Sequence, residues 1–359
     1  MTNLFLISTP LQLLNAIEAK RYFNIPNHQS SVIFLTYTSN YNSIVKILVP
    51  NEWGNIHFVN EAESQTSHEE NIKGGKIMPI LKELRRKSHR IKELVDQYAK
   101  VNFVFVGYYL GLEQIHFVNS IAAKEIILLD DGIATLEVNN RRVGQISFLN
   151  SWSFSFFVKA LVKKFIFGYR LRHPQSVSFF SIYEIEVLKR DFLIKHKYEG
   201  IRSLIKDRET CDEVYFLGQP LSEIEPIIVT EGDYFLYLNA VVSFFKDKRI
   251  VYVPHRDEDK DKVTRIRFEL DLLVEELEVP FEWFMINKEK RPKAIAGFIT
   301  SALPNCKELF GADLSIYSFR IEGESIINDA MRMLVSDTYS YFEKIADAQF
   351  KVIDKILES

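Results

Sequence analysis

The stretch Leu4–Tyr22, LFLISTPLQLLNAIEAKRY, contains the pattern that decides the fold. Its first residues, Leu4–Ser8, form a short apolar run typical of a buried strand, and Pro10–Tyr22 begins with a proline in the first turn of an expected helix. A buried strand followed at once by a helix is the start of a βαβ unit, from which parallel sheets are built. The opening of the chain therefore predicts an α/β fold.

The same alternation recurs along the chain. In the first half it predicts a helix at Ile77–Ala99 and further strands at Val32–Tyr37, Ile56–Asn60, Phe103–Gly107 and Glu125–Leu129. In the second half it predicts helices at Gly232–Phe245, Asp259–Leu277 and Ile326–Leu357, and strands at Val214–Gly218, Ile250–Pro254, Phe281–Phe284, Gly297–Ser301 and Ser315–Phe319. We therefore expect an α/β protein with two Rossmann-like domains that face each other across a cleft. The expected domains are residues 1–195 and 196–334, and a C-terminal helix at about 335–359 could pack back on the first domain.

Composition excludes several classes of protein. The 359 residues include 45 Lys and Arg against 48 Asp and Glu, so no surface for nucleic acid is expected. Cys211 and Cys306 are the only cysteines, which excludes a disulfide framework and a cysteine metal cluster and fits a reducing cytoplasm. No run of about 18 uncharged apolar residues predicts a membrane-spanning helix, and Met1–Pro10 lacks the basic start of a secretory signal.

Two adjacent carboxylates follow one predicted strand. In Rossmann-like domains ligands bind beyond the carboxyl ends of the strands, which is where Asp130 and Asp131 lie, and Gly132 lets the backbone turn away. Repulsion between neighbouring carboxylates tends to raise one pKa, and a raised pKa suits a general base. The alternative is an ordinary Asp-Gly turn with no catalytic role.

His255 and Arg256 follow the predicted strand Ile250–Pro254. A histidine at this position can donate a hydrogen bond or a proton to a phosphate leaving group, and an arginine can hold an anionic oxygen in its planar fork. The alternative is a histidine with a purely structural role. The charged residues that come next, 257–262, are interpreted as the solvated start of a helix.

Two further candidates lie later in the chain. Thr300 and Ser301 end a predicted strand, where hydroxyl groups and free backbone amides can hold a phosphate, although they could equally do no more than cap the next helix. Glu282 stands between aromatic residues and could bind ribose hydroxyls, or could face solvent on an edge strand.

Familiar cofactor motifs are absent from the sequence. There is no Walker A loop and no G-x-G-x-x-G, which removes the usual support for ATP and nicotinamide chemistry. No set of His and Asp residues is recognised as a divalent metal site. We therefore expect no cofactor and no metal, and any chemistry on activated sugars would be independent of metal ions.

Five motifs together resemble the bacterial sialyltransferases of the two-domain GT-B fold. In chain order these motifs are Leu4–Gln12, Leu129–Gly132, Tyr215–Pro220, Tyr252–His255 and Phe298–Ala302. Each motif is short, and the resemblance rests on their order and spacing across most of the chain. The sequence looks most similar to the lipooligosaccharide sialyltransferases, glycosyltransferase family 52, with the bacterial polysialyltransferases as more distant relatives.

The resemblance implies a metal-independent, inverting enzyme that moves sialic acid, or a related nonulosonic acid, from a CMP-sugar to a hydroxyl of a cell-surface glycan, as in lipooligosaccharide or capsule. Asp131 would be the general base, with Asp130 shaping its pKa and position. His255 would protonate or hydrogen-bond the departing phosphate. The other implied contacts are to the donor from Thr300, Ser301, Glu282, Arg256, Gly218 and Gln219, and to the acceptor from Thr9 and Gln12.

The chain departs from that family at two motifs. The family usually has His-Pro where this chain has His255 and Arg256. It often has an acid where this chain has Leu221, with Glu223 as the nearest carboxylate. Two alternatives therefore stay open, a GT-B enzyme that uses a UDP-sugar and a non-catalytic module that binds a glycan or nucleotide.

The segment Trp152–Arg172 mixes aromatic and aliphatic residues with the cations Lys159, Lys163, Lys164, Arg170 and Arg172. This composition is typical of an interfacial helix, which would bring the enzyme to the anionic inner face of a bacterial membrane and to a lipid-linked acceptor. The alternative is an ordinary helix that packs its apolar side on the sheet. The expected location is cytoplasmic, with this segment as a peripheral membrane contact.

Overall fold

The strand and helix at the start of the chain form where the sequence predicts them. Strand β1 (Asn3–Ile7) is buried along its length, and helix α1 (Pro10–Tyr22) has its proline in the first turn, where the missing N–H leaves no partner unsatisfied. The computed structural model describes residues 2–35, 38–59, 77–132, 134–144, 154–172, 174, 176–205, 209–354 and 356–358. It divides the chain into two compact units, Met1–Ile201 and Arg202–Ser359.

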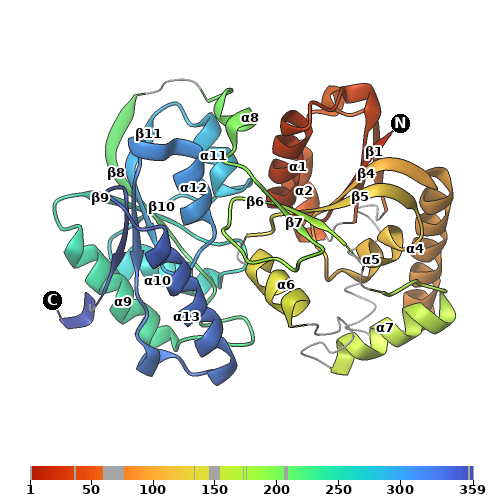
Figure 1. The fold of residues 1–359 in the computed structure, drawn as a ribbon. Helices are drawn as coiled ribbons and strands as arrows, with labels where there is room; N and C mark the ends of the chain where they lie inside the picture. The colour runs from red at the N-terminus through yellow and green to blue at the C-terminus, as the bar shows by residue number, and fades with distance from the viewer. Residues whose placement is uncertain are drawn as a thin grey trace. The chain divides into compact units, whose positions relative to one another are not determined.

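The first unit is built on one parallel sheet with the strand order β3-β2-β1-β4-β5-β6-β7 (Figure 1). Its other strands are β2 (Ser30–Phe34), β3 (Asn55–Phe58), β4 (Lys100–Val106), β5 (Ala122–Leu129), β6 (Ser178–Ser181) and β7 (Phe192–Lys195). Its other helices are α2 (Thr38–Ile47), α4 (Ile77–Gln97), α5 (Leu112–Val118), α6 (Ala134–Val143) and α7 (Phe154–Ile166), and α8 (Glu199–Arg202) leads into the second unit.

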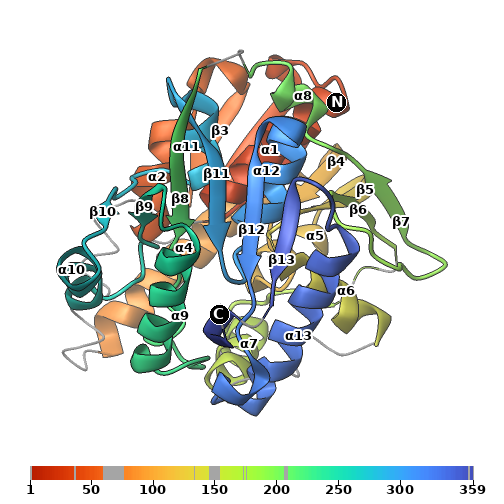
Figure 2. The ribbon, with the colours of Figure 1, turned by 90° about the vertical axis from the view of Figure 1, so that its left-hand side faces the viewer.

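The second unit repeats this architecture with the strand order β10-β9-β8-β11-β12-β13, again all parallel. Its strands are β8 (Thr210–Leu217), β9 (Arg249–Val253), β10 (Leu273–Val274), β11 (Arg291–Gly297), β12 (Ser315–Phe319) and β13 (Phe350–Ile353). Its helices are α9 (Glu231–Phe244), α10 (Lys260–Glu269), α11 (Phe281–Asn287), α12 (Ala302–Phe310) and α13 (Asp329–Lys344). Figure 2 shows β8 and β11 side by side within this sheet.

The two sheets have the same order, in which the first strand of the unit lies between the second and the fourth. This is the Rossmann order, and the prediction of an α/β protein with two Rossmann-like units is confirmed. The order reverses between β1 and β4 in one sheet and between β8 and β11 in the other. Ligands of open α/β sheets bind beyond the carboxyl ends of the strands at this switch point.

Two predicted elements between β9 and β11 are wrong. The residues predicted as a strand at Phe281–Phe284 form α11, because a helix buries Phe281 and Met285 on one face. The predicted helix Asp259–Leu277 ends at Glu269, since Asp271 has a φ of 51°, which a helix does not allow. The two residues of β10 follow at once and pair with β9.

Two further predictions change at the end of the chain. The strand predicted at Gly297–Ser301 ends at its first residue, so Thr300 and Ser301 lie in the loop before α12. The helix predicted at Ile326–Leu357 stops at Lys344. Its last part, the C-terminal helix predicted at about 335–359, instead contains β13, which pairs with β12 and buries Phe350. That end of the chain therefore belongs to the second sheet.

Strands β6 and β7 have no counterpart in the predicted elements, because each has four residues, which is too short for a periodic pattern. Three residues of the predicted strands, Thr36, Tyr37 and Asn60, lie outside the described residues.

Candidate active site

The carboxylate of Asp131 lies beyond the end of β5, next to the amino end of α1. Thr9, the N-cap of α1, donates its hydroxyl to Asp131 Oδ1 at 3.5 Å and accepts the Gln12 N–H at 3.2 Å. The Asp131 N–H is bonded to Thr135 Oγ1 at 2.9 Å. Burial raises the pKa of Asp131 to about 6, and hydrogen bonds from Gln12 and Thr9 oppose part of that rise. The side chain is a carboxylate whose pKa lies close to neutrality.

The neighbouring Asp130 points into the unit. Its carboxylate accepts hydrogen bonds from Ser181 Oγ at 2.6 Å and from the Ile182 N–H at 2.7 Å, and the buried ring of His196 lies 3.8 Å away. Burial raises the pKa of Asp130 to about 7, with a smaller contribution from the charge of Asp131. The two acids therefore have different surroundings, and burial, rather than the repulsion expected to raise one pKa, is the main cause that raises both. Asp130 holds the end of β5 against β6.

A line of buried polar residues on α1 supports this edge of the first sheet. Gln12 accepts the Ser8 N–H at 2.7 Å, Asn15 donates to the Asp130 carbonyl at 2.9 Å, and Glu18 accepts the backbone amides of Gly200 and Ile201. At Gly107 a Cβ atom would come within 2.3 Å of Gln12 Oε1, so glycine is required for this close approach. Gln12 is fully buried, and therefore lies beneath the surface on which Thr9 and Asp131 stand.

In the second unit, four of the predicted donor residues, Gly218, Gln219, Thr300 and Ser301, lie at the switch point between β8 and β11. Gln219, after β8, accepts the Ile299 N–H through Oε1 at 2.9 Å, which joins the loops that follow the two strands. Thr300 Oγ1 accepts the Ala302 N–H at 3.3 Å, and Ser301 is the N-cap residue of α12. Half-buried hydroxyl groups thus lie together with the amino end of a helix at this point, an arrangement suited to a phosphate.

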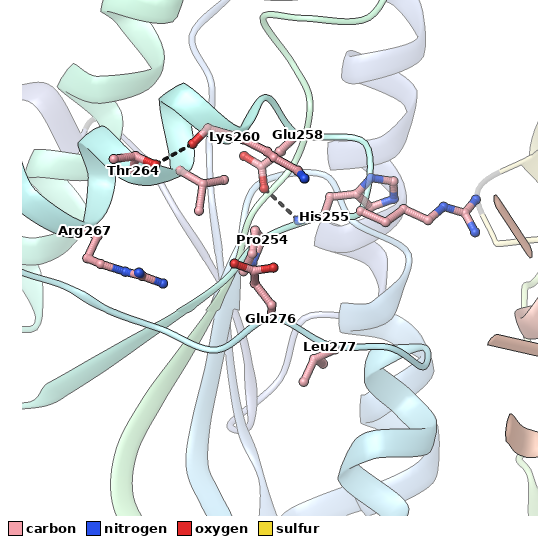
Figure 3. Close-up of a pocket in the computed structure, with 10 residues that line it drawn as sticks. Pro254, His255, Glu258, Lys260, Thr264, Arg267, Glu276 and Leu277 are labelled. Atoms are coloured by element: carbon pink, nitrogen blue, oxygen red, sulfur yellow. Dashed lines mark hydrogen bonds between the residues drawn. The ribbon is translucent and has the colours of Figure 1, made fainter. Parts of the chain in front are cut away.

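His255 and Arg256 line a cavity of about 270 Å³ beyond β9 (Figure 3). Lys260 and Arg267 of α10 line it as well, and Glu276 approaches from the loop after β10. The cations outnumber the exposed carboxylates here, so the cavity suits an anionic ligand.

The environment of His255 determines which ring nitrogen carries the proton. Nδ1 accepts the Asp257 N–H at 3.2 Å, which leaves the proton of the neutral ring on Nε2. Partial burial lowers the pKa of His255, and Asp257 works in the opposite direction. The imidazole is therefore neutral at pH 7 and can offer an N–H donor.

The structure separates two glutamates that the sequence does not distinguish. Glu282 is buried on α11, where Asn305 donates to its Oε1 at 2.8 Å, and burial raises its pKa. Glu276 instead lines the His255 cavity. Glu276 is not predicted from sequence because it follows a two-residue strand that lies inside a predicted helix. The usable signal is the apolar pair Leu273–Val274, which lies two residues before it.

A buried ion network holds the loops of the second unit together. The ammonium of Lys262 lies 2.7 Å from Glu258 Oε1, 2.9 Å from Glu223 Oε1 and 3.1 Å from the Gln219 carbonyl. Glu258 in turn accepts the Tyr252 hydroxyl at 2.6 Å and the His255 N–H at 2.7 Å. The interpretation of residues 257–262 as a solvated helix start is therefore wrong for Glu258 and Lys262, because their charges neutralise each other inside the unit.

Gly218 is part of the same arrangement. A Cβ atom at this position would come within 2.3 Å of Glu258 Oε2 and 2.4 Å of the Tyr252 hydroxyl. A side chain here would displace the network, so Gly218 acts by leaving room for it. Among the described residues, no three His, Cys, Asp or Glu side chains gather as a metal site requires.

Comparison with protein families identifies the chain. The family model described as alpha-2,8-polysialyltransferase (POLYST) matches residues 3–318. The chain belongs to this family. It is a glycosyltransferase of the sialyltransferase type, so the predicted resemblance to bacterial sialyltransferases is confirmed. The matching family is the one that the motifs placed as the more distant relative.

Solved structures resemble the chain in fold. A 2,6-sialyltransferase from a Photobacterium species, crystallised with CMP and lactose, is 12% identical over 98% of this chain and 78% of its own, with a TM-score of 0.49. A Listeria monocytogenes protein assigned as a UDP-N-acetylglucosamine 2-epimerase is 10% identical over 98% of this chain and 92% of its own, with a TM-score of 0.50. No curated protein matches the chain in sequence.

We predict that Lys262→Met lowers the free energy of unfolding by about 3–5 kcal/mol, because it leaves the buried carboxylate of Glu258 without its cation. Lys248→Met is the matched control. Lys248 lies the same 2.7 Å from a carboxylate, that of Asp212, but this pair is exposed and screened by solvent, so the loss should be clearly smaller. Urea unfolding of the full chain measures both losses. Equal losses would show that the Lys262 network contributes no more than a surface pair.

Proposed function

We propose that the chain transfers sialic acid, or a related nonulosonic acid, from a CMP donor to a hydroxyl of a glycan in one inverting displacement without a metal ion. The observation that carries this proposal, in a chain of the sialyltransferase family, is a carboxylate with a pKa near neutrality at the carboxyl edge of the first sheet, Asp131. The cationic cavity around His255 supports the nucleotide part.

Asp131 accepts the proton of the acceptor hydroxyl in this proposal. With a pKa of about 6 it is mostly ionised at pH 7, yet more basic than an ordinary aspartate. The Thr9 hydroxyl bonded to Asp131 Oδ1 helps to fix the orientation of the carboxylate that would accept the proton. As the hydroxyl loses its proton, its oxygen forms the new bond to the anomeric carbon of the sugar.

The bond between the anomeric carbon and the phosphate oxygen breaks on the opposite face, and CMP leaves with the electron pair. The transition state resembles an oxocarbenium ion, so stabilising the departing phosphate lowers the barrier. His255 Nε2–H, the hydroxyls of Thr300 and Ser301, and Arg256 are the proposed donors to that phosphate. Attack opposite the leaving group inverts the anomeric centre.

We assign the ribose contact to Glu276 in place of Glu282. A carboxylate that binds a ribose diol has to face the nucleotide, and Glu276 lines the His255 cavity, whereas Glu282 is buried and bonded to Asn305. That Asp131 and His255 face the same cleft stays a prediction, because each belongs to a separate unit.

The proposed acceptor is a cell-surface glycan of the lipooligosaccharide or capsule type, extended at the inner face of a bacterial membrane. The family description adds an α-2,8 linkage to sialic acid as the proposed product class. The alternative donor is a UDP-sugar, which Arg256 favours because a second phosphate needs a further cation.

Nucleotide binding separates the two donors. We expect saturating CMP to raise the thermal midpoint by a few degrees, since a ligand at about 100 times its Kd adds about 2.7 kcal/mol. UDP should give no shift. Glu276→Gln should remove the CMP shift, and Glu282→Gln, which keeps the bond from Asn305, should retain it. A shift with UDP alone would replace CMP by UDP as the donor nucleotide.

Asp131 gives the transfer reaction a characteristic pH dependence. Below a pKa of about 6 the carboxylate is protonated and cannot accept a proton, so kcat/KM should fall about tenfold per pH unit under pH 6. Asp131→Asn should lower kcat/KM at pH 7 by about 10²-fold or more, with CMP binding retained. The exposed Asp212→Asn is the control, and CMP release from CMP-sialic acid with an acceptor is the measurement. Unchanged kcat/KM in Asp131→Asn would show that Asp131 is not the general base, and no turnover by either the wild type or the variant would leave the chain as a binding module.

A further inference from the structure

Helix α7 turns an apolar face away from the first unit. Val158, Leu161, Val162, Phe165 and Ile166 follow the spacing i, i+3, i+4, i+7, i+8, which gathers side chains on one side of a helix. Phe165 is 76% exposed and Ile166 is 64% exposed. A helix that serves its own unit turns such a face to the core. Because this face points outward, packing in the core of the unit does not explain why its residues are apolar.

The opposite face of α7 is fastened to the unit by a charged side chain. Lys163 forms an ion pair with Glu113 of α5, which also binds Lys87 of α4 at 3.2 Å. Burial raises the pKa of Glu113, but the two lysines outweigh burial and hold it below its usual range, so the cluster stays ionised. If the helix were rotated to turn its apolar face inward, this cluster would be broken. The buried carboxylate of Glu113 would then lose the ammonium of Lys163. The charge pairing therefore fixes which face is outside.

The charge around the apolar face has a single sign. Residues 154–172 include no Asp or Glu, and Lys159, Lys164, Arg170 and Arg172 are exposed. At 100° per residue, Lys159 and Lys164 border the apolar face on its two sides. An apolar strip bordered by cations is complementary to a surface that is apolar inside and anionic outside. A second copy of α7 would instead bring like charges together.

We propose that α7 is an interfacial helix that lies on an anionic phospholipid bilayer, with Phe165 and Ile166 among the acyl chains and Lys159 and Lys164 at the headgroups. Thirteen residues of helix measure about 20 Å, which suits a helix in the membrane plane and is too short to span the bilayer. Among the described residues, no helix has the length and apolarity to cross a membrane. Trp152, at the start of the segment predicted from sequence, lies outside the described residues.

This contact is independent of sialyl transfer and needs no substrate. It would hold the first unit at the surface where a lipid-linked acceptor is anchored. The contact combines an apolar and an electrostatic part, and each part has its own substitution.

Flotation of the full chain with vesicles tests the proposal. The wild type should float with phosphatidylglycerol–phosphatidylcholine vesicles, less at high salt, and little with phosphatidylcholine alone. Phe165→Glu combined with Ile166→Glu should weaken binding at least about tenfold. Lys159→Gln combined with Lys164→Gln should weaken binding to anionic vesicles about 25-fold, at about fivefold per lysine. Phe268→Glu on α10, where Phe268 is also 76% exposed, is the matched control and should float like the wild type.

Three results would overturn the proposal. The first is a wild type that does not float with the anionic vesicles. The second is a variant with Phe165→Glu and Ile166→Glu that floats as well as the wild type. The third is a wild-type dimer in light scattering that this variant separates, without flotation of either protein, which would make α7 an interface between copies of the chain. Circular dichroism and the thermal midpoint verify that each variant is folded, which is expected because the substituted side chains are exposed.

Discussion

All strands of each sheet run in one direction, and this constraint determines where the candidate residues lie. Parallel strands end at a common edge, and at the switch point the chain leaves neighbouring strands toward opposite faces. Asp131 follows β5, Gln219 follows β8, His255 follows β9, and Thr300 and Ser301 follow β11. Residues far apart in the sequence therefore come to one edge in each unit without long loops, and the chemistry follows from which side chains are placed there.

The two units hold these edges by different means. In the first unit, buried amides and carboxylates on α1 bond to backbone groups of other segments. In the second unit a buried ammonium, Lys262, binds acceptors from the loops after β8 and β9 at once. Buried ion pairs add little net stability compared with apolar packing. We therefore infer that the main role of Lys262 is to fix the relative positions of the loops that it joins. Its partners meet only when the loops after β8 and β9 are both in place. Glu258 also accepts the His255 N–H, so the position of the His255 backbone depends on the same network.

Much of the fold and part of the candidate site could be predicted from sequence. The repeated strand pattern gave both Rossmann-like units, and the rule that ligands bind after strands found Asp131, His255 and Thr300. Short elements were not predicted correctly. The residues of α11 were predicted as a strand because aromatic residues suit either structure, and β10 lies within a predicted helix. Glu276 was lost with β10. The pairing of Lys262 with Glu258 could not be predicted, since an isolated run of charges does not reveal which members are buried.

The same physical effect, partial removal from water, prepares the two candidate catalytic groups in opposite senses. For a carboxylate it disfavours the charged form and raises the pKa, and for an imidazole it disfavours the charged form and lowers the pKa. Asp131, with a pKa of about 6, still ionises at pH 7, whereas His255 is neutral there and keeps a proton on Nε2. One group can thus accept a proton while the other donates a hydrogen bond, and neither has to change state first. Acid–base complementarity at neutral pH follows from burial at two edges, without a further ionisable residue.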